Sequence, residues 1–116
     1  MKKWLLLVLM GVLLLNATQL TTSEAAPVKP ILYFWGEGCP ACKDVAPVID
    51  KLIAGKYPVE KYEVYNDRNN MDRLAMLFKM NGVPEQDWAI PVAFYNGKMY
   101  MGAPNILALG KEVAPE

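Results

Sequence analysis

The sequence of 116 residues contains no histidine and only two cysteines. Without an imidazole group the chain cannot form a serine–histidine–aspartate triad, a cysteine–histidine pair, or a zinc or haem site with a histidine ligand. Two thiols alone are also a poor ligand set for a metal cage. Many classes of enzyme are therefore excluded, and the remaining chemistry must use sulfur, lysine or carboxylate groups.

An excess of either charge is also absent, because 12 lysine and arginine residues balance 12 aspartate and glutamate residues. A chain with this balance lacks the basic signal of a nucleic-acid-binding protein, so we expect no nucleic-acid partner. The sequence has no internal repeat and no low-complexity tract. Its length suits one folded domain with a modest core.

The first residues have the three-part layout of a secretory signal. Two lysines precede the apolar run Trp4–Leu15, and polar and small residues follow it up to Ala26. The run has 12 residues, whereas a helix that spans a membrane needs about 20. Small residues at Ser23 and Ala25 fit cleavage before Ala26, and Leu15–Ala17 is a second candidate cleavage site.

We therefore predict a signal peptide at residues 1–25 and a folded domain at residues 26–116. The protein would be exported to the periplasm or secreted, and an uncleaved membrane anchor is the alternative. Export would place both cysteines in a compartment where disulfides persist.

The first half of the folded domain reads as strand, helix and strand. Ile31–Trp35 is a short apolar run bounded by a proline and by glycines, which is typical of a strand covered on both faces. Apolar residues then recur at the spacing of one helix face, at Val45, Val48, Ile49, Leu52 and Ile53. Gly55 ends this helix, and Val59–Tyr65 reads as the second strand. Because no hairpin fits between these strands, we predict a parallel, right-handed βαβ unit.

The second half reads as a helix, a hairpin and a last helix. Asn66 or Asp67 can cap a helix that ends at Asn81–Gly82. Two short runs, Pro91–Tyr95 and Lys98–Met101, flank an Asn-Gly pair, the dipeptide that best signals a two-residue hairpin. A small helix is expected around Ile106–Leu109. Together these elements predict an α/β domain with a small mixed sheet.

The two cysteines form the motif Cys39-Pro40-Ala41-Cys42, which follows the first strand and opens the first helix. The thiolate is the reactive form of cysteine, and the free N–H groups and dipole at a helix N-terminus stabilise it. Pro40 fits the first helical position, where a missing N–H costs nothing. We expect Cys39 to attack a target sulfur and Cys42, one turn further in, to resolve the mixed disulfide.

Other interpretations of this pair are a structural bridge and a metal site. A bridge that closes only four residues gains roughly 2 kcal/mol or less from loop entropy. A zinc site would need a second cysteine pair, and Lys43 stands where a c-type haem attachment has histidine. A Cu(I) carrier that uses the two thiolates remains an alternative.

The chain resembles the thioredoxin-like superfamily over residues 28–109. Phe34–Lys43 is similar to the strand, loop and active-site helix of the family, Pro47 to the proline that kinks this helix, and Ile90-Pro91 to the cis-proline. The resemblance implies a thioredoxin-like α/β fold with the order β-α-β-α-β-β-α and helices on both faces of the sheet. It also implies the substrate-binding positions Ile90, Pro91, Pro40 and Ala41.

Some positions depart from the family pattern. Pro84 is an alternative cis-proline, but the polar segment after it does not suit a strand, so we favour Pro91. The hairpin spacing resembles glutaredoxins, whereas the stretch at Gly102 lacks their paired glycine and acid, which hold glutathione. Tyr33 stands where thioredoxins carry an aspartate that shuttles the proton of the second cysteine. Glu37, water or another carboxylate would take that role.

The resemblance thus implies an extracytoplasmic thiol–disulfide oxidoreductase that exchanges disulfides with protein substrates, acting as a reductant. A dithiol oxidase, a glutaredoxin-like enzyme and the Cu(I) carrier are the alternatives. We expect a monomer without a cofactor or resident metal, whose partners are protein thiols and disulfides. A membrane electron-relay protein would supply the electrons.

Overall fold

The computed structural model describes residues 29–114. The predicted signal peptide, residues 1–25, lies outside the described residues. The elements follow in chain order: β1 Ile31–Trp35, α2 Pro40–Ala54, β2 Val59–Glu63, α3 Arg68–Met80, the 3-10 helix η2 Glu85–Asp87, β3 Val92–Tyr95, β4 Lys98–Met101 and α4 Ala103–Val113. Apart from η2, this is the predicted order.

The four strands form one mixed sheet in the order β2-β1-β3-β4. β1 pairs with β2 in parallel, so the predicted βαβ unit is confirmed, and it places Tyr33 opposite Lys61. β3 runs antiparallel to β1, and the β3–β4 hairpin turns at Asn96 and Gly97 as predicted. β1 is therefore a central strand, and the chain leaves its carboxyl end at the loop that carries the cysteines.

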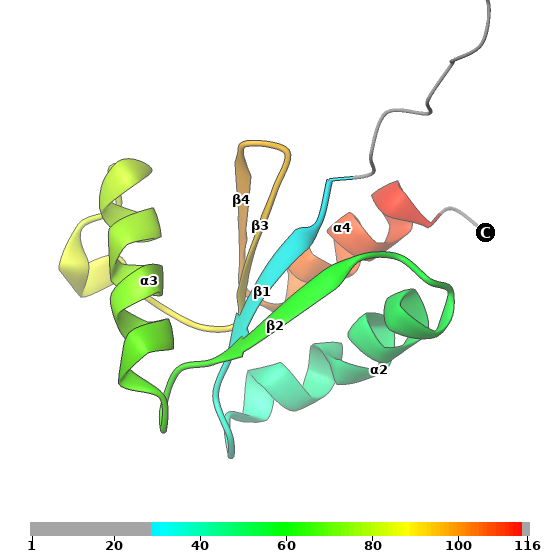
Figure 1. Ribbon diagram of the computed structural model, residues 1–116, viewed down its shortest axis with the longest axis horizontal. Helices are drawn as coiled ribbons and strands as arrows, with labels where there is room; N and C mark the ends of the chain where they lie inside the picture. The colour runs from blue at the N-terminus through cyan, green and yellow to red at the C-terminus, as the bar shows by residue number, and fades with distance from the viewer. Residues whose placement is uncertain (1–28, 115–116) are drawn as a thin grey trace, which may run out of the picture.

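Helices cover both faces of the sheet, as predicted (Figure 1). α2 and α4 pack on one face, where Tyr33 of β1 meets Ile49 of α2 and Ile106 of α4 in one buried cluster. α3 packs on the other face, where Phe78 lies in a second cluster with Phe34 of β1. Alternate side chains of β1 are buried on opposite faces of the sheet, so β1 packs against both helix layers. The end of β1 is therefore a rigid support for the cysteine loop.

Local sequence explains where α2 begins and ends. Cys39 is its N-cap, and Pro40 occupies the first turn. Gly55 is the C-cap, as predicted, and its amide donates to the carbonyl of Lys51 over 3.0 Å. Pro47 lies inside the helix and cannot donate the bond that would reach the carbonyl four residues earlier. The first turn is therefore less tightly bound to the rest of α2 than an ordinary helical turn.

The ends of β2 and of the last helix differ from the predictions, and β3 begins at Val92 rather than at Pro91. β2 ends at Glu63 and not at Tyr65, because Glu63 turns the chain by accepting a hydrogen bond from the amide of Asn66. The last helix is longer than Ile106–Leu109 and extends over Ala103–Val113. It reaches that length because Pro104 fits its first turn and because Gly110 is buried against α2 rather than ending the helix. The polar segment Glu85–Asp87 forms a 3-10 turn.

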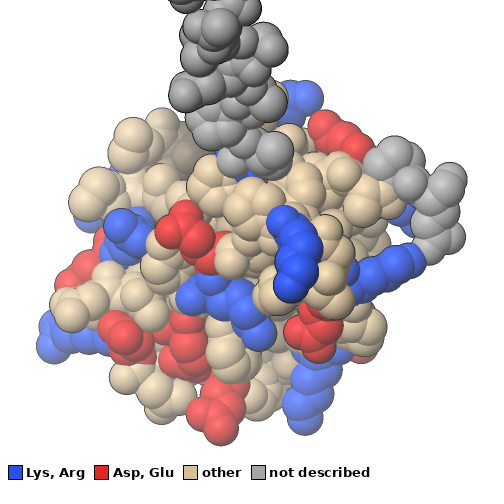
Figure 2. Space-filling view, turned by 45° about the vertical axis from the view of Figure 1, so that its right-hand side comes forward, with Lys and Arg blue, Asp and Glu red and all other residues tan. Residues whose placement is uncertain are grey.

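The described part of the chain contains no helix long and apolar enough to cross a membrane. On the face in Figure 2, acidic and basic side chains are interspersed among uncharged ones. That distribution agrees with the balanced charge of the sequence.

Candidate active site

Cys39 and Cys42 form a disulfide at the N-terminus of α2, with their Cα atoms 5.2 Å apart. The amide of Cys42 donates a hydrogen bond to Sγ of Cys39 over 3.2 Å. Cys39 is 7% exposed and Cys42 is 4% exposed. The first turn of α2 contains no acidic residue, so the helix dipole acts on Cys39 without an opposing carboxylate from that turn.

The loop before the cysteines is held by its own backbone. The amide of Cys39 donates to the carbonyl of Gly36 over 3.1 Å. Gly38 has φ +82°, a conformation that other residues adopt only at a cost of roughly 1–2 kcal/mol. The glycine just before Cys39 is therefore required by the turn that delivers Cys39 to the helix cap.

The segment at Pro91 lies next to this loop. The Ile90–Pro91 bond is cis, as the resemblance predicted, and it is the sole cis bond among the described residues, so Pro84 is not the cis-proline. Pro91 is buried, and its carbonyl accepts a hydrogen bond from Gly102 over 2.8 Å. A Cβ placed on Gly36 would lie 2.8 Å from Cδ1 of Ile90. The cysteine loop and the segment before β3 thus form one surface.

The predicted substrate positions differ in exposure. Pro40 is exposed and Ala41 and Ile90 are half-buried, whereas Pro91 is enclosed. The structure therefore leaves Pro40 and Ala41 accessible between the two cysteines and Ile90 partly accessible beside Gly36.

Trp88 belongs to the packing of α3 rather than to this surface. Its ring stacks on Phe78 with centroids 5.4 Å apart, and its Nε1 donates to the carbonyl of Val83 over 3.0 Å. Both its apolar area and its polar atom are used within the fold.

A hollow of about 250 Å³ opens beside the disulfide. Besides the cysteines, its lining includes Tyr33 and Trp35 of β1, Glu37 of the loop and Lys61 of β2. Nζ of Lys61 lies 5.2 Å from the centre of the Trp35 ring, a distance at which the cation and the ring attract each other. The hollow therefore brings a lysine to the side of the cysteines that faces β2.

Tyr33 occupies the place where the resemblance implies an aspartate. Burial, and to a lesser degree the charge of Asp50, raises the pKa of Tyr33 to about 12. The phenol therefore stays protonated near neutral pH and cannot accept a proton from Cys42. Glu37 is the carboxylate that lines the hollow, and the hollow is large enough for water molecules. These observations leave Glu37 and water as the acceptors anticipated from the sequence.

Glu63 is a residue of the site that the sequence analysis missed. Its carboxylate accepts hydrogen bonds from the amide of Glu37 over 2.8 Å and from the amide of Asn66 over 2.7 Å. These bonds, with the amide of Glu37 as the largest contribution, lower the pKa of Glu63. Glu63 thereby joins the end of β2 to the loop before Cys39. The signal in the sequence was the parallel pairing of the strands, which places Glu63 opposite Trp35.

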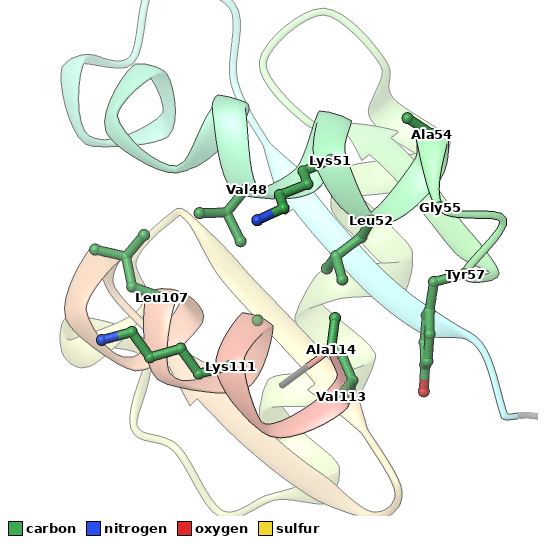
Figure 3. A pocket seen from close by; sticks show the side chains of 11 residues that line it. Val48, Lys51, Leu52, Ala54, Gly55, Tyr57, Leu107, Lys111, Val113 and Ala114 are labelled. Atoms are coloured by element: carbon green, nitrogen blue, oxygen red, sulfur yellow. The ribbon is translucent and has the colours of Figure 1, made fainter. Parts of the chain in front are cut away.

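A larger hollow of about 1050 Å³ lies between α2 and α4 (Figure 3). Val48 and Leu52 of α2 face Leu107 and Val113 of α4 across it, and its polar lining side chains include Lys51 and Lys111. The lining residues include neither cysteine and no carboxylate. The smaller hollow therefore holds the reactive groups, although it has about a quarter of the volume.

The described residues contain no group of three or more cysteine, aspartate or glutamate side chains that could hold a metal ion. A metal at Cys39 and Cys42 would thus have two protein ligands from these residue types, a number that suits Cu(I) but not a closed zinc site.

The fold is thioredoxin-like. This assignment rests on the strand order, on helices covering both faces, and on the cis-proline that directly precedes β3. No protein-family model matches the chain, and no curated protein matches it. Among solved structures, the chain is similar to oxidized glutaredoxin 2 from Chlamydomonas reinhardtii, with 24% identity and a TM-score of 0.49. The match covers 73% of this chain and 74% of the other.

Proposed function

We propose that the protein is a thiol–disulfide oxidoreductase that acts on protein disulfides through Cys39 and Cys42. One observation carries this proposal. The two cysteines form a disulfide at the N-terminus of α2, where Sγ of Cys39 accepts a backbone hydrogen bond, and Ile90, which precedes the cis-proline, lies against Gly36 of the cysteine loop. A sulfur at a helix N-cap next to a second sulfur is suited to disulfide exchange.

The reduced protein would act in two exchange steps. The Cys39 thiolate attacks one sulfur of a substrate disulfide, forming a mixed disulfide and releasing the other substrate sulfur as a thiolate. Cys42, after losing its proton, attacks Sγ of Cys39 and releases the second substrate thiolate. The substrate gains two electrons and the protein is left with its Cys39–Cys42 disulfide. An external dithiol must return two electrons to complete the cycle.

The surroundings of the disulfide support these roles. The amide of Cys42 and the helix dipole would stabilise the Cys39 thiolate. Glu37, through water in the hollow, would accept the proton of Cys42, because Tyr33 stays protonated. Pro40, Ala41 and Ile90 would contact the substrate segment, and Pro91, whose side chain is enclosed, would fix the backbone of Ile90 for that contact.

The location and the direction of electron flow form the rest of the proposal. The signal-like residues 1–25 support an extracytoplasmic site of action. Two features support action as a reductant. The domain is small and its described residues form no helical insertion, and Pro47 lies within α2. A membrane electron-relay protein would then be the donor, and the protein would work as a monomer.

Reduction of insulin tests the activity. With dithiothreitol as the donor, the wild-type protein should accelerate insulin reduction and Cys39→Ser should abolish the acceleration. Turnover that does not depend on Cys39 would overturn the proposal. Equilibration with glutathione tests the direction, since about 30 mV corresponds to a 1.4 kcal/mol difference for a two-electron couple. A potential near about −270 mV supports a reductant, and one near about −120 mV overturns that direction.

A second experiment distinguishes the oxidoreductase from the Cu(I) carrier. In an anaerobic titration of the reduced protein against a Cu(I) probe, the oxidoreductase proposal predicts that the probe keeps the metal. Tight binding of Cu(I) without any disulfide exchange would replace the oxidoreductase by the carrier.

A further inference from the structure

Tyr65 lies next to the cysteine loop with most of its side chain in solvent. It follows β2 in the chain and is 61% exposed. Its ring lies directly over Gly36, since a Cβ on Gly36 would clash with Cε2 and Cδ2 of the ring. Gly36 is therefore a glycine because the ring occupies the space of a side chain.

The same position also meets Ile90. A Cβ on Gly36 would lie 2.8 Å from Cδ1 of Ile90, so Tyr65 and Ile90 both reach the space above the Gly36 backbone. The carbonyl of Gly36 accepts the amide hydrogen bond of Cys39. The side chains of Tyr65 and Ile90 thus both lie against Gly36, the residue whose carbonyl accepts the hydrogen bond that positions Cys39.

The backbone next to Tyr65 is held in place. Glu63 accepts hydrogen bonds from the amides of Asn66, the next residue after Tyr65, and of Glu37. Tyr65 is therefore presented by a loop that is tied to the cysteine loop itself, and its ring does not have to be ordered when a ligand binds. A fixed, exposed aromatic side chain offers apolar area at a low entropic cost to binding.

Other large apolar side chains on the described surface lie on helices. These are Ile53, Met76, Met80 and Leu107. Among these exposed apolar side chains of the described residues, Tyr65 is the one that lies against the cysteine loop. Aromatic residues of this kind are enriched among residues that carry binding energy.

We propose that Tyr65 and Ile90 form an apolar platform that selects disulfides flanked by an aromatic or large aliphatic side chain. The ligand is an extended protein segment whose cysteine meets Cys39 while the neighbouring side chain stacks on Tyr65. This inference rests on the proposed oxidoreductase function and names the substrate class of that site.

Two disulfide-linked peptides that differ at one position test the platform. One has phenylalanine next to the cysteine and the other has serine. The wild-type protein should reduce the phenylalanine peptide with a kcat/KM about threefold to tenfold higher, the range expected for one aromatic contact. Tyr65→Ala should bring the ratio of the two kcat/KM values close to one, whereas Tyr65→Phe should keep it.

Met80→Ala is the matched control, because Met80 is 74% exposed but lies at the end of α3. It should keep the wild-type ratio. The redox potential of Tyr65→Ala should equal that of the wild type, because a selecting residue does not change the chemistry of the sulfurs. Tyr65→Leu, which keeps apolar volume over Gly36, provides the same comparison should Tyr65→Ala unfold, and it should lower the ratio without abolishing it.

The outcomes separate this inference from the function on which it rests. Turnover of both peptides at equal rates by the wild type, or an unchanged ratio in Tyr65→Ala, overturns the platform and leaves the oxidoreductase proposal in place. Failure of the wild type to reduce either peptide overturns the oxidoreductase proposal.

Discussion

The backbone amide of Cys42 donates a hydrogen bond to Sγ of Cys39 over 3.2 Å, so the first turn of α2 is capped by a sulfur atom. A side chain that caps a helix must accept hydrogen bonds, and a thiolate accepts them better than a thiol. The cap therefore distinguishes the two cysteines. Under the proposed function, Cys39 would be the thiolate that attacks, and Cys42, within the helix, would be the cysteine that resolves.

This distinction predicts different behaviour of the two serine variants. Cys42→Ser should accumulate a mixed disulfide between Cys39 and a substrate, because nothing remains to resolve it. Cys39→Ser should accumulate little, because the remaining thiol lies inside α2 and not at the N-cap, where a thiolate is stabilised. Mass spectrometry after incubation with an oxidised peptide measures both adducts. Equal trapping by the two variants would contradict the assignment of roles.

Glu63 should make stability depend on pH. Its folded-state pKa is lowered from the ordinary 4.5 by amide hydrogen bonds. Its contribution to the free energy of unfolding is therefore present above about pH 5 and is lost as the pH falls through the folded-state pKa. Glu63→Gln should be less stable than the wild type at pH 7, and the difference should shrink towards pH 3, as measured by urea denaturation.

Glu60→Gln controls for the loss of a charge on the same strand, because Glu60 is exposed and its carboxylate accepts a hydrogen bond from the hydroxyl of Tyr62. It should show a smaller difference between pH 7 and pH 3. A Glu63 difference that stays constant over this range would contradict the proposed cause.

Tyr33 should affect stability only at high pH. Its pKa is raised from 10.0 to about 12 in the folded state, so the unfolded chain loses the phenol proton first as the pH rises. Stability is complete below about pH 10 and falls between pH 10 and pH 12. Tyr33→Phe should therefore lose less stability than the wild type over that interval. The pH dependence of activity between pH 6 and pH 9 should have the same shape for both proteins. If Tyr33→Phe removed an ionisation from this profile, the phenol of Tyr33 would take part in proton transfer, which would contradict its assignment as a group that stays protonated.

Gly110 should tolerate alanine only when Val48 is shortened. A Cβ on Gly110 would lie 2.5 Å from Cγ1 of Val48, and overpacking of this kind costs about 1–3 kcal/mol. Alanine also gains about 1 kcal/mol over glycine within a helix. Gly110→Ala alone should therefore lower the free energy of unfolding by about 1 kcal/mol. In a Val48→Ala background the same change should raise it, which a double-mutant cycle would measure.

The element order was predictable because local signals agreed with one another. The apolar run at Ile31–Trp35 predicted a strand, the helical spacing after Cys39 predicted a helix, and Asn96-Gly97 predicted a hairpin turn. The structure contains all three. The length of α4 was not predictable, because Gly110 reads as a helix end. Its role depends on Val48 of another helix, which no local pattern reveals.

The cysteine pair could be found from the sequence because its two members are neighbours in the chain. Glu63 and Tyr65 could not, because their roles arise from contacts with Glu37 and Gly36 across the parallel β1–β2 pair. Such contacts follow from the register of the strands, and a single sequence predicts that two strands pair more readily than it predicts their register.

The disulfide closes a ring within the first turn of α2, and both buried clusters are built by other contacts. Opening that ring releases very little chain, so the oxidised and reduced proteins should have nearly the same shape. A partner then has no distant structural change by which to sense the redox state. It must meet the two sulfur atoms themselves, which means that recognition of the redox state and electron transfer occur in a single encounter.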